Sequence, residues 1–125
     1  MKITVPRGAT DTHIHFYDSA APAAPNTFTP GHFAVAEYRA LQKQLGLERV
    51  IVVQPNAYAD DNRVTLAAIR ELGPAARGAA VGKPGVAGAE LDRLTKGGIR
   101  ALRITTLPGG TLGFHVKDEL LARAH

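Results

Sequence analysis

The chain has 125 residues, of which 45% are hydrophobic, and a net charge of +4. This composition excludes a disordered chain and suits one globular domain. The sequence has no cysteine, which excludes disulfides, thiolate metal sites and cysteine nucleophiles and fits a reducing compartment. No apolar run approaches the roughly 20 residues that cross a bilayer, and the first residues lack a signal-peptide core. We therefore expect a soluble cytoplasmic protein with no membrane partner.

The excess positive charge lies in the second half of the chain. Residues 1–60 hold five basic and five acidic side chains, whereas residues 61–125 hold ten basic and six acidic ones. The basic residues occur singly and without interleaved aromatic residues, so we interpret them as solvated helix faces and expect no nucleic-acid partner. A small anionic ligand remains compatible with this charge.

The apolar pattern alternates between the periods of strands and helices. Strands are predicted at residues 9–16, 49–54, 77–82 and 99–106. Helices are predicted at residues 35–45, 90–96 and 116–124. A further helix is predicted between the first two of these, with Asp60 or Asp61 as its N-cap and Leu72 as its last apolar residue. This order implies parallel strands joined by right-handed crossovers. A doubly wound sheet and part of a (β/α)8 barrel both satisfy it.

The first predicted helix has a clear apolar stripe. Val35, Tyr38, Leu41 and Leu45 are spaced for one face of this helix, and Gly46 is expected to end it. We expect this face to pack on the sheet.

The residues with the most chemistry lie on the first predicted strand. Because side chains alternate across a strand, one face is expected to carry Asp11, His13 and His15. The other face is expected to carry Thr12, Ile14 and Phe16. Two imidazoles about 6–7 Å apart, at about 3.3 Å per residue, can converge on one metal ion or one water molecule. A purely structural role for the pair is the alternative.

Three segments in the same order resemble a known family. Thr-Asp-Thr-His-Ile-His-Phe-Tyr-Asp at 10–18, Val-Val-Gln-Pro-Asn-Ala-Tyr at 52–58 and Gly-Ile-Arg-Ala-Leu-Arg-Ile at 98–104 resemble the first, second and fourth strands of the amidohydrolase superfamily. They are most similar to its amidohydrolase-2 branch, which includes pyrone-dicarboxylate and sulfomuconolactone hydrolases and galactarolactone isomerase. The resemblance implies an α/β fold of the TIM (β/α)8-barrel kind. Residues 1–125 would then be the N-terminal part of a single truncated domain, a half barrel of four βα units.

The resemblance also implies roles for five residues. His13 and His15 would line the barrel mouth, as ligands of a divalent metal such as Zn²⁺ or as metal-free groups that bind and polarise substrate and water. Asn56 and Tyr58 follow the second strand, where βα loops form the site, and would bind substrate. Arg103 would point into the mouth and clamp a substrate carboxylate, with a rim ion pair as the alternative.

Three further polar residues have mainly structural interpretations. Gln54 has the same strand parity as Val50 and Val52, so a buried, hydrogen-bonded amide is one interpretation of it. His32 and His115 lie in loop-like or terminal segments and are predicted to be surface residues.

The implied function is hydrolysis of a small carboxylated lactone or related cyclic ester, by attack of an activated water on the carbonyl. The alternatives are a sugar-lactone isomerase of the same branch and a non-catalytic fragment that binds a metal or an anion. In the family, a further His and a general-base Asp come from later strands, so we expect this chain alone to be inactive. The open sheet edges would favour homo-oligomers.

Overall fold

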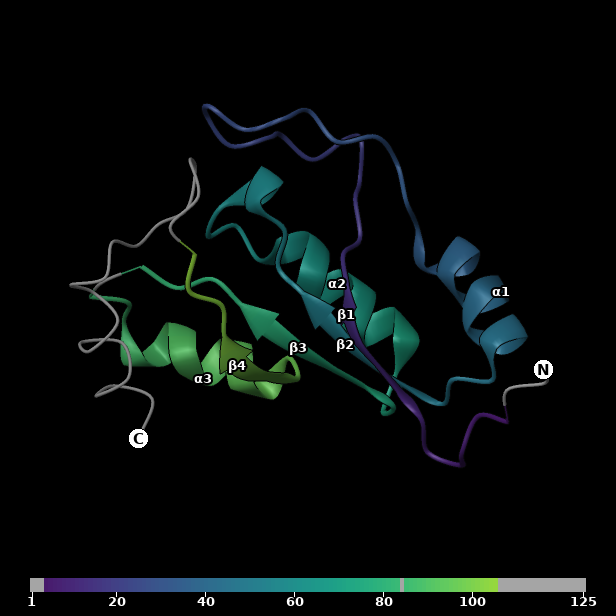
Figure 1. The fold of residues 1–125 in the computed structure, drawn as a ribbon. Helices are drawn as coiled ribbons and strands as arrows, with labels where there is room; N and C mark the ends of the chain where they lie inside the picture. The colour runs from purple at the N-terminus through teal and green to yellow at the C-terminus, as the bar shows by residue number, and fades with distance from the viewer. Residues whose placement is uncertain (1–3, 84, 106–125) are drawn as a thin grey trace.

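The structure is a computed structural model that describes residues 4–83 and 85–105 (Figure 1). Its strands are β1 (Thr10–Ile14), β2 (Arg49–Val53), β3 (Ala76–Ala80) and β4 (Ile99–Leu102). Its helices are α1 (Val35–Leu45), α2 (Arg63–Leu72) and α3 (Gly88–Lys96), with a short 3-10 helix η1 (Asn56–Tyr58) after β2. The predicted alternation is therefore confirmed as far as β4. The helix predicted at residues 116–124 and His115 lie outside the described residues.

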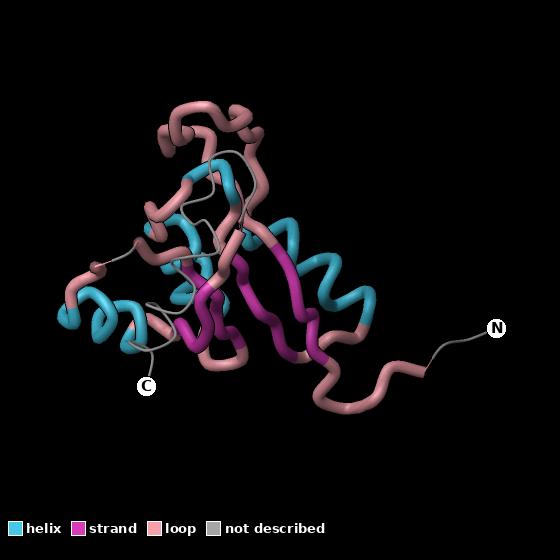
Figure 2. Tube along the Cα trace, turned by 60° about the vertical axis from the view of Figure 1, so that its left-hand side comes forward, coloured by secondary structure: helices cyan, strands magenta, loops and turns pink. Residues whose placement is uncertain are grey.

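The order of strands in the sheet separates the two architectures that the sequence allows. The order is β1-β2-β3-β4, and each neighbouring pair is parallel. A doubly wound sheet reverses its strand order at a switch point, whereas a barrel adds each strand beside the last one. Right-handed crossovers in this order place all three helices on one face of the sheet. Figure 2 shows the strands side by side, leading toward the long loops at one end.

A single apolar core joins that face of the sheet to the helices. Alternate strand residues point into it, so Val50 and Val52 of β2 are buried while Ile51 between them is only partly buried. All three helices contribute to the same cluster of buried residues, which consists of Phe16, Val35, Tyr38, Val50, Val52, Ala68, Ile69, Ala76, Ala80, Leu94 and Ile99.

The apolar face of α1 is confirmed only in its first half. Val35 and Tyr38 are buried, and the helix ends at Gly46 in the left-handed conformation, as predicted. Leu41 and Leu45, however, are 44% and 48% exposed. The spacing of apolar residues indicates which side of a helix is apolar but not how far its neighbours extend. Among the described strands β1 lies at the edge, so α1 is covered on one side only.

The start of α2 differs from its prediction for a local reason. The residue before the helix is Asn62, not Asp60 or Asp61. The carboxylate of Asp61 accepts hydrogen bonds from the backbone N–H and the guanidinium of Arg63. The Asn62 side chain makes no capping bond, because it pairs with the backbone of Val81 instead.

Two features bear on partners. In the described sheet, β1 and β4 each have a neighbouring strand on one side only. None of the helices in residues 4–83 and 85–105 combines the length and the apolarity that crossing a membrane would require.

Candidate active site

A β-bulge in β1 brings the two histidines to the inner face of the sheet. Asp11 pairs with Val50 and Ile14 pairs with Val52, so three steps along β1 oppose two steps along β2. Both partners on β2 face the helical core, and Asp11 and Ile14 therefore share that outer face. The prediction that Asp11 lies on the same face as His13 and His15 is wrong, because the extra residue in the bulge inverts the alternation between them.

The histidine pair forms a defined hydrogen-bonded unit. His15 Nδ1 lies 2.7 Å from the carbonyl oxygen of Val53, so this nitrogen carries a proton and donates it. In a neutral His15 the Nε2 atom is then an acceptor. His13 Nε2 lies 3.2 Å from it and must be the donor of that contact. The backbone of β2 thus fixes the tautomers of both rings.

Burial favours the neutral form of His15. Desolvation lowers the pKa of His15 below its ordinary value, and the charges of His13 and Arg103 lower it further, against the raising effect of the Val53 carbonyl. A proton added to His15 would also set two N–H groups against each other across 3.2 Å. At neutral pH the His15 ring is therefore an imidazole, not an imidazolium.

The two histidines are close enough to serve as two ligands of one metal ion. Zn–N distances of about 2.0–2.1 Å allow two nitrogens 3.2 Å apart to share one ion. Metal-binding histidines also commonly donate their second N–H to a carbonyl, as His15 does to Val53. Within the described parts of the chain, no group of three His, Cys, Asp or Glu residues is close enough to hold a metal.

Arg103 reaches the same end of the sheet from the segment just after β4. Its Nη1 donates a hydrogen bond to the carbonyl oxygen of Gln54 at 2.5 Å. The neighbouring carbonyl, that of Val53, holds His15, and the charge of Arg103 lowers the pKa of that histidine. In the part of the chain that the structure describes, Arg103 forms no ion pair with an acid. The predicted inward orientation of Arg103 agrees with this geometry.

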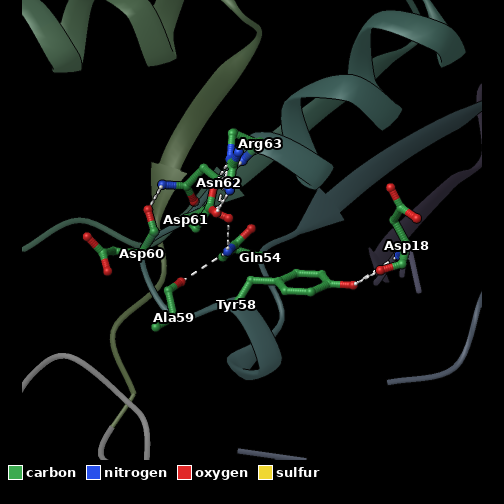
Figure 3. A network of polar contacts seen from close by, with 8 residues as sticks. All are labelled: Asp18, Gln54, Tyr58, Ala59, Asp60, Asp61, Asn62 and Arg63. Atoms are coloured by element: carbon green, nitrogen blue, oxygen red, sulfur yellow. Dashed lines mark hydrogen bonds and ion pairs between the residues drawn. The ribbon is translucent and has the colours of Figure 1, made fainter. Parts of the chain in front are cut away.

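The other two predicted substrate-binding residues lie on η1 and differ in character. Asn56 has a buried Oδ1 atom with no hydrogen-bond partner among the described residues. Tyr58 is 3% exposed, and its hydroxyl accepts from the N–H of Asp18 and donates to the carbonyl of Asp18 (Figure 3). Tyr58 therefore ties η1 to the β1–α1 loop, whereas Asn56 keeps an acceptor available.

An aromatic surface continues from the histidines. The Tyr17 ring lies 6.2 Å from His15, 6.3 Å from Tyr58 and 6.0 Å from Phe28, measured between ring centroids. Phe28, in the β1–α1 loop, is 57% exposed. Desolvation raises the pKa of Tyr17, so its hydroxyl is neutral at physiological pH.

Neither nearby acid faces the histidine rings as a base. One Asp11 oxygen accepts from the hydroxyl of Tyr38 at 3.1 Å, and the other accepts from the backbone N–H of His13. The carboxylate of Asp18 accepts from the N–H of Ala20 in its own loop. These contacts leave the described side of the site without a general base positioned at the pair.

Two structural interpretations are confirmed. Gln54 is fully buried and hydrogen-bonded by its side chain, and His32 is exposed. Sequence reasoning missed Tyr17, although its position two residues after His15 places it on the same face of an extended chain. It also missed the role of Val53, which acts through a backbone carbonyl that residue type does not reveal.

Comparison with known proteins gives the family. The family model described as "Amidohydrolase" matches residues 10–125. D-galactarolactone isomerase of Agrobacterium fabrum is 38% identical over 123 residues, which are 96% of this chain and 42% of that protein. The 2-pyrone-4,6-dicarboxylate hydrolase of Comamonas testosteroni is 35% identical over 120 residues (94% and 39%). The 4-sulfomuconolactone hydrolase of Rhizobium radiobacter is 30% identical over 128 residues (100% and 42%).

Solved structures agree with these relatives. A crystal structure of an Agrobacterium tumefaciens protein, 37% identical, matches 96% of this chain and 45% of its own with a TM-score of 0.87. A Pseudomonas putida structure, 23% identical, matches with a TM-score of 0.78 and supports the fold alone. The chain spans less than half the length of the relatives that it matches. From the family match over nearly its whole length and from these identities, the chain belongs to the amidohydrolase family.

Proposed function

We propose that this chain supplies the first-strand side of the active site of a hydrolase that acts on a small carboxylated lactone or a related cyclic ester. The observation that carries the proposal is the anchoring of two functional groups by consecutive residues at the end of β2, its last residue Val53 and the following Gln54. The carbonyl of Val53 holds His15 and the carbonyl of Gln54 holds Arg103. The histidine pair, with His15 neutral, and a guanidinium therefore face one space at the carboxyl ends of the strands, where barrel enzymes bind their substrates.

Arg103 is suited to bind the carboxylate of such a substrate. One N–H of its guanidinium donates to Gln54, and the remaining N–H donors form a planar fork that matches a carboxylate. The partnerless Oδ1 of Asn56 would accept from a substrate hydroxyl or from a water.

The histidine pair is suited to orient water and the reacting carbonyl. In hydrolysis a water oxygen bonds to the carbonyl carbon, the ring C–O bond breaks, and a proton moves to the leaving oxygen. A water inserted between the two rings would accept from His13 Nε2 and donate to His15 Nε2. The base that removes the proton from water would come from outside the described residues, because Asp11 and Asp18 are held elsewhere.

His13 and His15 would also hold a divalent metal such as Zn²⁺, which when bound supplies Lewis-acid activation of water. Titration calorimetry with Zn²⁺ separates the metal-dependent and metal-free forms of the proposal. Heat that disappears in both His13→Ala and His15→Ala, but persists in the exposed control His32→Ala, supports a metal site. Identical heats in all variants contradict it.

Isomerisation of a sugar lactone is the second candidate, and the 38% identity to D-galactarolactone isomerase favours it. The two reactions differ in whether the site removes a substrate proton or delivers water. Both place the ring beside the histidine pair and the carboxylate on Arg103.

Assays on 2-pyrone-4,6-dicarboxylate and on galactarolactone with the full-length gene product decide between these candidates. Hydrolysis of the first supports the proposal, and isomerisation of the second without ring opening supports the alternative. Either activity should be lost in His13→Ala and retained in His32→Ala. An active His13→Ala variant contradicts the assigned site, and inactivity on both lactones leaves metal or anion binding as the function that the titrations test.

Location and assembly are part of the same proposal. The lack of cysteine supports a cytoplasmic location. The edges at β1 and β4 support self-association, and light scattering that gives a strictly monomeric mass contradicts it.

A further inference from the structure

Gln54 occupies a central position beneath the candidate site. It follows β2 directly and is completely buried. Its backbone N–H donates to the carbonyl of Ala79 at 2.8 Å, which extends the pairing of β2 with β3. Its own carbonyl accepts from Arg103. The backbone of Gln54 therefore joins the sheet to the proposed carboxylate-binding group.

The side chain of Gln54 holds the loop that follows. Its Nε2 donates to the carbonyls of Ala59 at 3.0 Å and Asp61 at 2.9 Å, and Figure 3 shows the amide pointing into the turn of this loop. Its Oε1 accepts from the hydroxyl of Thr65 on α2 at 2.5 Å. Both amide protons and one oxygen lone pair are thus in use, which fixes the orientation of the amide.

One of these contacts falls on a strained residue. Ala59 has φ 46° and ψ −119°, a combination that L-residues rarely adopt and that resembles the glycine position of a type II′ turn. The carbonyl bonded to Gln54 belongs to this same residue. Such a conformation persists only where surrounding contacts enforce it. Gln54 supplies one of those contacts from the interior of the fold.

The strained loop carries the two residues that were predicted to bind substrate. Asn56 and Tyr58 belong to η1, and Ala59 follows that helix directly. The N–H of Ala59 donates to the carbonyl of Asn56 at 3.0 Å. The N–H of Asp61 donates to the carbonyl of Tyr58 at 2.9 Å. A change at Ala59 is therefore transmitted directly to the backbone of both residues.

We propose that Gln54 is a positioning residue that holds the loop of residues 55–61 in its strained conformation and thereby sets the placement of Asn56 and Arg103 for a carboxylated substrate. This inference rests on the proposed function for the identity of the substrate. The hydrogen bonds of Gln54 with Ala59 and Asp61 are local, so the effect of losing them is concentrated in this loop. A buried amide that merely filled the core would need partners, but these need not include the carbonyl of a strained residue and that of the residue two positions later.

The experiment compares Gln54→Met, which removes both amide donors at similar volume, with Gln44→Met, the same change at an exposed position of α1. Thr65→Val is a milder variant that removes only the hydroxyl that donates to Gln54 Oε1. It replaces Gln54→Met in the comparison if Gln54→Met fails to fold. Amide hydrogen exchange is measured in the free protein. Binding of 2-pyrone-4,6-dicarboxylate is measured by titration, with the Arg103 side-chain NMR signal as a reporter.

Gln54→Met should raise the exchange rates of the Ala59 and Asp61 amides at least about 10-fold more than that of Val52. It should shift the Arg103 signal and weaken pyrone-dicarboxylate binding about 5-fold or more, whereas Gln44→Met changes none of these. Adding Ala59→Gly removes the strain and should restore part of the affinity that Gln54→Met loses. The same second change should restore part of any affinity that Thr65→Val loses.

Two results overturn the proposal. One is an equal rise in exchange at Val52, Ala59 and Asp61, which indicates only a general loss of stability. The other is a Gln54→Met variant whose affinity Ala59→Gly does not restore. If the wild-type protein does not bind the pyrone at all, the proposed function fails, while the exchange and the Arg103 signal still decide whether Gln54 holds the loop.

Discussion

The Nε2 atoms of His13 and His15 lie 3.2 Å apart, and the bond from His15 to Val53 leaves one proton between them. Protonation of His15 would break this contact, because a proton on its Nε2 atom would face the N–H of His13. The backbone of β2 therefore determines both the orientation and the protonation of the first-strand site. A consequence for the pH dependence of folding follows directly.

We predict that His15 makes the fold less stable in acid. Its folded pKa lies below the ordinary value of 6.5, so below pH 6.5 the unfolded chain takes up a proton that the folded chain does not. The free energy of unfolding should therefore fall as the pH drops below 6.5 and recover as the pH rises through it. Urea unfolding between about pH 5 and pH 8 tests this.

The matched variants are His15→Gln and the exposed His32→Gln. The first should flatten the pH dependence in this range, whereas the second should leave it as in the wild type. If His15→Gln keeps the full acid sensitivity, the pKa of His15 is not the cause.

Tyr58→Phe should loosen the β1–α1 loop without changing the core. It removes the hydroxyl that bonds both the N–H and the carbonyl of Asp18, and should cost about 1–2 kcal/mol of unfolding free energy. Tyr17→Phe is the control, since the Tyr17 hydroxyl has no hydrogen-bond partner in the described structure. Thermal unfolding gives the comparison, and equal effects of the two changes would refute the role of Tyr58 as a tie between loops.

Asn62→Ala should be among the more damaging polar substitutions. Asn62 is 4% exposed and bonds the carbonyls of Asp60 and Val81 and the N–H of Val81. Its loss leaves buried groups unpaired, so we expect a cost of about 2–3 kcal/mol in chemical denaturation. Asn62→Asp keeps the acceptor for Val81 N–H and should fall between the wild type and Asn62→Ala. A loss below about 1 kcal/mol for Asn62→Ala would contradict this account.

Gly78→Ala should destabilise the contact between β3 and the helices. A Cβ atom on Gly78 would lie 2.4 Å from Ile69 Cδ1 and 2.7 Å from Ile99 Cδ1, which forces the core to shift. We expect a cost of about 1–3 kcal/mol. Gly82→Ala is the control, because its Cβ would meet only Leu102 Cδ2 at an ordinary 3.7 Å. Similar midpoints for the two variants in urea would show that the packing at Gly78 is looser than described.

Local pattern predicted the elements of this fold well, because each strand and helix expresses its own period. The parity of Val50, Val52 and Gln54 on β2 also predicted correctly that the Gln54 amide is buried. The same alternation failed at Asp11, since the bulge depends on how β1 pairs with β2, about 38 residues further along the chain. A local sequence pattern does not contain such a pairing.

The candidate site was predictable only as far as side-chain type reveals it. His13, His15 and Arg103 lie at one end of the sheet, where the resemblance to the family placed them. The backbone carbonyls of Val53 and Gln54 orient His15 and Arg103. Any residue type has such a carbonyl, so the sequence does not reveal this role. The cap of α2 was mispredicted for a related reason, because the partner of Asn62 is a distant backbone, that of Val81.

The most direct test of the central claim is a titration of the protein with 2-pyrone-4,6-dicarboxylate, comparing Arg103→Lys with Arg100→Lys. Arg100 is exposed, lies on β4 three residues before Arg103 and, within the described residues, donates only to the backbone carbonyls of Thr95 and Ile99. A lysine retains the charge of Arg103 but not its bidentate fork. We predict that Arg103→Lys weakens binding about 10-fold or more and that Arg100→Lys leaves it unchanged. Equal affinities of the wild type and Arg103→Lys would contradict the assignment of this end of the sheet as the substrate site.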